Sequence, residues 1–74
     1  MTEYPNELKK LTAIASDLEL PSALRTKAIE QLGNIGTHLA LRALLDLAAN
    51  EELIAEEREL ALKYAREVIM SGRK

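Results

Sequence analysis

Apolar residues recur along the chain at helical spacing, in four blocks separated by short segments that contain proline, glycine or polar residues. The first block predicts a helix over 5–18, because its apolar side chains share one face and a proline is tolerated in the first turn. Pro21 cannot continue that helix. The next three blocks predict helices over 22–34, 37–49 and about 55–70.

The residues between these blocks suggest how the helices begin and end. Ser22 and Thr37 stand at the starts of the second and third predicted helices, where a side-chain oxygen can accept a hydrogen bond from an unpaired amide. Gly33 and Gly36 follow the second helix, and both are expected to turn the chain with positive φ. This predicts a tight connection between the second and third helices.

The third predicted helix is apolar on nearly all sides and is expected to be the most buried. Only His38, Arg42 and Asp46 form a polar strip along it. The fourth helix begins with several acidic residues, which suit the positive end of a helix dipole. We therefore expect Glu56, Glu57 and Glu59 to form a solvated acidic helix start.

The two halves of the chain repeat each other, with position i of the first half matching position i+33 of the second. A fixed period of this size is typical of helical repeat proteins. The identical pairs are Leu8 and Leu41, Leu11 and Leu44, Ala15 and Ala48, Leu20 and Leu53, Arg25 and Arg58, and Ala28 and Ala61. We expect a single all-α domain of two stacked antiparallel helix hairpins, 6–36 and 37–70, with a frayed tail over 71–74. An up-down four-helix bundle is the alternative.

Composition narrows the class of protein further. The chain has 74 residues, no Cys, no Phe or Trp, and a net charge of −2 with both signs interspersed. Disulfides are excluded, the aliphatic residues suit close-packed helices, and no broad basic surface attracts nucleic acid or membrane. Residues 1–7 lack the features of a signal peptide, and no stretch is apolar over the length of a membrane span. These features predict a cytoplasmic protein that neither crosses nor binds a membrane.

Residues 24–36, with the sequence LRTKAIEQLGNIG, resemble the second helix of a HEAT-like repeat of the short kind found in phycobilisome lyase-type proteins. The family also places an acidic residue six positions before the arginine, a spacing that both halves of the chain keep. The resemblance covers about 6–70 and implies a scaffold that binds other proteins; it brings no lyase chemistry. The second copy departs from the pattern with Ala65 and Arg66 in place of Leu-Gly, and with Glu57 at an expected apolar position.

The acidic residues at that spacing are Glu19, before Arg25, and Glu52, before Arg58. We expect each acid to meet its arginine across the turn between paired helices, as a structural ion pair. The alternative is an anion-binding surface. The ion-pair interpretation predicts that the substitution Arg25→Ala weakens folding.

No pattern in the chain points to catalysis, a metal or a cofactor. His38 is the only histidine, and neither a cysteine nor a pair of carboxylates stands at ligand spacing from it. The acidic residues after Asn50 lack the Glu-x-x-His pattern of helical di-metal sites. No nucleophile, base and orienting group occur together in a recognisable pattern. We therefore expect a protein that is not an enzyme.

The fourth helix carries apolar residues over an arc of about 200°, wider than a last helix with one covered side needs. Two explanations stand. Leu60 and Tyr64 pack back on the first hairpin, or Leu62, Tyr64 and Ile69 contact another molecule, with Leu60 as a further contact residue. The pattern does not decide between a capped monomer and a homodimer.

The leading hypothesis is a non-catalytic protein-interaction or scaffold module that binds a protein, itself included. An accessory subunit or regulator of a larger enzyme complex is the main alternative. A nucleic-acid-binding HEAT-like protein is disfavoured, because the basic residues lie among acidic ones.

Overall fold

The computed structural model describes residues 5–71, which form four α-helices and no strand. The helices are α1 (Pro5–Ala15), α2 (Ser22–Ile35), α3 (His38–Ala48) and α4 (Ala55–Ser71). The all-α class and the number of helices are thus as the hydrophobic pattern predicts. Ser71, which was expected in a frayed tail over 71–74, closes α4, and 72–74 lie outside the described residues.

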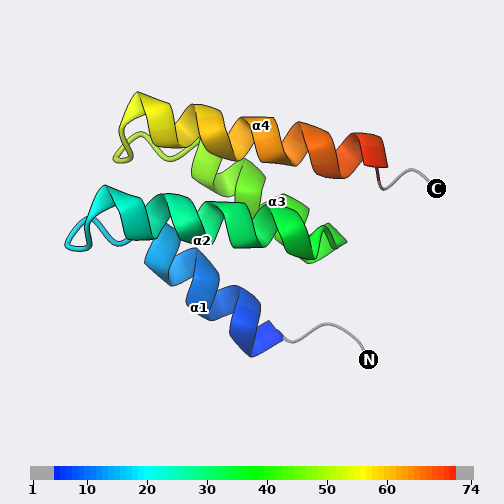
Figure 1. Ribbon diagram of the computed structural model, residues 1–74, viewed down its shortest axis with the longest axis horizontal. Coiled ribbons are helices and arrows are strands. Elements are labelled where there is room, and N and C mark those ends of the chain that lie inside the picture. The colour runs from blue at the N-terminus through cyan, green and yellow to red at the C-terminus, as the bar shows by residue number, and fades with distance from the viewer. Residues whose placement is uncertain (1–4, 72–74) are drawn as a thin grey trace.

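The helices form two hairpins that stack side by side (Figure 1). α1 packs against α2, and α3 packs against α4. α2 and α4 run alongside each other in the same direction, and α3 lies behind them. Within residues 5–71, α1 and α4 do not touch. A closed up-down four-helix bundle would bring its first and last helices together, so the arrangement is a stack of hairpins.

The sequence repeat recurs in the backbone. α1 and α3 are both 11 residues long, and they begin at Pro5 and His38, which are equivalent positions of the repeat. α2 and α4 begin at Ser22 and Ala55, which are equivalent in the same way. The two hairpins therefore begin both of their helices at matching positions.

The turns inside the hairpins also share their hydrogen bonds. The Leu20 amide donates to the Asp17 carbonyl at 3.1 Å, and the Leu53 amide donates to the Asn50 carbonyl at 3.2 Å. The side chains of Asp17 and Asn50 each accept from the amide two residues on, at 2.9 Å in both cases. Asp and Asn side chains favour this local bond, which explains why both turns follow the same path. It also explains why α1 ends at Ala15 and not at 18 as predicted.

Two of the expectations about the connection between the hairpins are confirmed, at Gly36 and at Thr37. Gly36 has φ of 64°, where a residue with a Cβ is strained, and Thr37 Oγ1 accepts from the Ala40 amide at 3.2 Å. Two other expectations are wrong. Pro21 occupies the cap position of α2, so the Ser22 hydroxyl has a different partner. Among the described glycines only Gly36 has positive φ, and Gly33 lies within α2.

One aliphatic core runs through both hairpins. Its buried members are Leu8, Ala15, Ala28, Ile29, Leu32, Ala40, Leu44, Leu47, Leu53, Ala61, Ala65 and Val68. Alanines on α2 and α4 let these two helices approach closely. α3 buries Ala40, Leu44 and Leu47, but not every apolar side chain on it is covered, since Leu39 and Leu45 are exposed. A groove lined by both α1 and α3 leaves Leu39 uncovered.

Candidate interaction site

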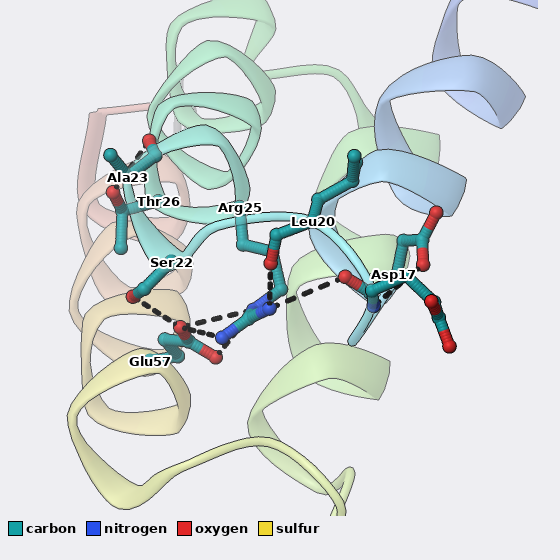
Figure 2. Close-up of polar contacts among 8 residues, drawn as sticks. Asp17, Leu20, Ser22, Ala23, Arg25, Thr26 and Glu57 are labelled. Atoms are coloured by element: carbon teal, nitrogen blue, oxygen red, sulfur yellow. Dashed lines mark hydrogen bonds and ion pairs between the residues drawn. The ribbon is translucent and has the colours of Figure 1, made fainter.

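A buried ion pair joins the two hairpins. Arg25 on α2 is 8% exposed and Glu57 on α4 is 1% exposed. Arg25 Nη2 lies 2.8 Å from Glu57 Oε2, and Arg25 Nε donates to both carboxylate oxygens at 3.0 Å. Figure 2 shows the guanidinium group between this carboxylate and the turn that follows α1. There Nη1 donates to the carbonyls of Leu20, at 2.6 Å, and Asp17, at 3.3 Å. The arginine thus binds the first turn and the second hairpin at once.

The Glu57 carboxylate has a second donor, the Ser22 hydroxyl, at 2.5 Å. Burial raises the pKa of the Glu57 carboxyl, but the hydrogen bonds from Arg25 and Ser22, the arginine charge and the Ile54 backbone together outweigh burial. The net pKa lies below its ordinary value of 4.5. The carboxylate is therefore ionised at neutral pH and matches the permanent charge of Arg25.

The predicted ion pairs are wrong in their partners. Arg25 pairs with Glu57 and not with Glu19, and within residues 5–71 no ion pair joins Glu52 to Arg58. The backbone amides of Glu19 and Glu52 donate hydrogen bonds within the two turns, and the side chains of both residues are exposed. The expectation that Glu57 belongs to a solvated acidic helix start is also wrong, because its side chain is buried against Arg25. The signal in the sequence was the charge at Glu57, where the repeat called for an apolar residue.

Gly33 lies where α2 and α4 approach each other closely. A Cβ built on Gly33 would lie 2.7 Å from Tyr64 Cδ1 and 3.0 Å from Tyr64 Cβ. The Tyr64 side chain therefore lies directly over the glycine backbone. Leu60 and Tyr64 are both half-buried and pack against the core. This packing is the one that the first explanation of the wide apolar arc on the fourth helix predicted.

The other two predicted contact residues are exposed, but in separate places. Leu62 is 38% exposed and lines a hollow of about 240 Å³ at the outer side of the second hairpin; the other lining residues are Ala48, Ala55, Arg58 and Glu59. Ile69 is 54% exposed and lines a second hollow, of about 320 Å³, near the connection between the hairpins. The structure does not bring the four residues together as one surface.

A third concavity, between α1 and α3, was not expected from the sequence. Its volume is about 550 Å³, and its lining residues are Leu8, Lys9, Thr12, Ala13, Leu39, Arg42, Ala43 and Asp46. The signal in the sequence was the apolar character of α3 on nearly all sides, and Leu39 on one of these sides is exposed at the groove. Charged residues at the groove are of both signs.

Neither a metal site nor a membrane span emerges from the described part of the chain. Within residues 5–71, no three His, Cys, Asp or Glu side chains gather as metal ligands would. None of the four described helices combines the length and the apolar character needed to cross a bilayer.

Comparison with known proteins adds no relative: no family model, no curated protein and no solved structure matches the chain. The resemblance to HEAT-like repeats stays a prediction from the sequence.

Proposed function

We propose that this chain is a small, non-catalytic protein-interaction module built from two HEAT-like hairpins, and that a partner protein binds the outer side of the second hairpin. The observation that carries the proposal is the exposure of Leu62. Its repeat equivalent in the first hairpin, Ile29, is fully buried. An apolar position that the fold buries in one hairpin stands open in the other.

Repeat energetics support this interpretation. Stacked repeats bury their apolar faces against their neighbours, and terminal repeats usually carry a polar outer face. Stable stacks also tend to need three or more repeats. This chain has two, and its last helix exposes Leu62, Ile69 and Met70. These side chains offer a partner protein the kind of apolar surface that a neighbouring repeat would cover.

The test is partner recovery with variants of α4. The substitution Leu62→Lys places a charge in the hollow, and Glu67→Lys places the same side chain at an exposed position outside that hollow. We expect a pull-down from the native cell to recover a partner with the natural chain and with Glu67→Lys, but not with Leu62→Lys. Thermal denaturation should show that both variants remain folded, because both positions are exposed.

Light scattering coupled to size-exclusion chromatography completes the test, because it detects a second copy of the chain as the partner. A natural chain that is strictly monomeric and recovers no protein would contradict the proposal. The substitution Tyr64→Glu is unsuitable here, because it would disrupt the contact with Gly33 and destabilise the fold.

A further inference from the structure

The hollow around Leu62 is the repeat counterpart of the joint between the hairpins. The equivalents of its lining residues in the first hairpin are Ala15, Ser22, Arg25, Thr26 and Ile29. In the first hairpin Ala15 and Ile29 are fully buried, and Ser22 and Arg25 hold the Glu57 carboxylate. The chain therefore contains an occupied example of this surface and an open one.

From this equivalence we propose that the hollow formed by Ala48, Ala55, Arg58, Glu59 and Leu62 binds an acidic helix of a partner protein, whose carboxylate pairs with Arg58. This inference rests on the proposed function, and it adds the chemistry of the partner. Arg58 is half-buried and, within the described residues, has no ion-pair partner. Its equivalent, Arg25, has one.

The occupied joint shows what such a helix presents. On α4, Glu57 reaches Arg25, the fully buried Ala61 follows four residues on, and Tyr64 lies over Gly33 after three more. Residues at this spacing share one face of a helix. The partner helix should therefore carry an acid, then a small residue four positions later, and a third contact residue three positions after that.

The third contact should differ from tyrosine. Gly33, which makes room for the ring, corresponds to Arg66 in the second hairpin, and Arg66 is exposed. At that position of the partner helix a second carboxylate suits better than an aromatic ring, since Arg66 provides a positive charge and leaves no room for a ring. Glu59 stands where the first hairpin has Thr26, so a basic residue beside the first acid would complement the surface.

Charge complementarity disfavours a second copy of this chain stacked end to end. In such a stack, α2 of the incoming copy would take the place of α4. Its residues equivalent to Glu57 and Tyr64 are Leu24, 49% exposed, and Gln31. Arg58 would then face a leucine and would be desolvated without a counter-charge, which is costly.

The probe for this proposal is a peptide with the sequence of residues 54–71 in which Tyr64 is replaced, Tyr64→Glu. It retains the acid at 57 and the alanine at 61. Titrated into the full-length ¹⁵N-labelled chain, it should cause saturable chemical-shift changes centred on Ala48, Ala55, Arg58 and Leu62. Arg58→Gln and Arg58→Glu in the chain should each weaken binding, the second by at least about tenfold.

Charge reversal on both sides gives the control for pairing. A peptide that also carries Glu57→Lys should bind the natural chain poorly and should regain affinity for the Arg58→Glu chain. Arg42→Glu, in the groove between α1 and α3, should leave peptide affinity within about twofold. Circular dichroism of each chain variant checks that it is folded. If Arg58→Glu is unfolded, the comparison of Arg58→Gln with the natural chain still tests the proposal.

Three results would overturn the proposal: no shifts at millimolar peptide, shifts centred on another surface, or equal binding by both Arg58 variants and the natural chain. A chain dimer that Leu62→Lys dissociates, with no peptide binding, would show that a second copy covers this surface instead. In that case, or where partner recovery still depends on Leu62 without peptide binding, the interaction module stands and the acidic-helix partner does not.

Discussion

At the scale of single residues, Arg25 and Glu57 decide how the hairpins join. Each is buried, and each satisfies the charge of the other while Arg25 also binds two turn carbonyls. Burying charges is costly, so the pair adds less net stability than its close geometry suggests. The pair joins the first turn of α2 to the first turn of α4.

Removal of one partner should be far more damaging than removal of both. We expect Arg25→Ala to lower the free energy of unfolding by about 3–5 kcal/mol, because the Glu57 charge stays buried without a partner. The double variant Arg25→Met/Glu57→Leu should lose much less. Urea denaturation measures both, with Arg58→Ala as the matched control at about 1 kcal/mol or less. Equal losses for the Arg25 and Arg58 variants would show that the pair does not matter.

Acid should weaken the fold through Glu57. Its pKa is lower in the folded chain than its ordinary 4.5, so its contribution to stability is complete above about pH 4.5. That contribution is lost as the pH falls from 4.5 through the lowered folded pKa. Thermal denaturation of the natural chain and of Glu57→Gln at about pH 7 and about pH 3 tests this. The stability difference between the two chains should shrink in acid; a constant difference would contradict the argument.

At the scale of elements, α2 and α4 approach closely because a glycine faces an aromatic ring. Gly33 sits inside a helix, where glycine costs about 1 kcal/mol relative to alanine. The chain accepts that cost because a Cβ at this position would collide with Tyr64, near its backbone as well as its ring.

Gly33→Ala should therefore destabilise the chain by about 1–3 kcal/mol, against its helix propensity, because α2 and α4 must move apart. In the background of Tyr64→Ala the same substitution should cost less, because the ring is gone and only the contact with the Cβ of residue 64, at 3.0 Å, remains. A double-mutant cycle of the four chains in urea measures this coupling. Additive effects would show that the two side-chain positions do not collide.

The elements themselves follow from local chemistry that the sequence displays. The starts of α2 and α4, the Thr37 cap and the positive φ at Gly36 all depend on neighbours close in the chain. The ion-pair partner of Arg25 and the role of Gly33 depend on α4, in the other half of the chain. Both expectations were wrong because the sequence pattern favours partners that are close in the chain, whereas the contacts of Arg25 and Gly33 come from α4. Leu60 and Tyr64 pack against the core, as the first of the two explanations for the wide apolar arc of the fourth helix predicted.

At the scale of the whole molecule, each hairpin is incomplete without the other. The buried core has members in both hairpins, and Arg25 of the first hairpin is paired with Glu57 of the second.

A chain that ends at Gly36 should thus fail to fold. Circular dichroism should show little helix for that fragment, against a strongly helical full chain, since 36 residues cannot bury enough apolar surface. A stable helical hairpin in the fragment would mean that the repeats are independent units.

The lack of contact between α1 and α4 within residues 5–71 has a kinetic consequence. Folding never requires the first and last of these helices to find each other, because every contact links helices that are adjacent or next but one in sequence. Short loops close at little entropic cost, and helical proteins with such local topology fold in microseconds to milliseconds. Temperature-jump relaxation should place this chain in that range, because even the longest side-chain hydrogen bond of the described residues, from Ser22 to Glu57, spans only 35 positions.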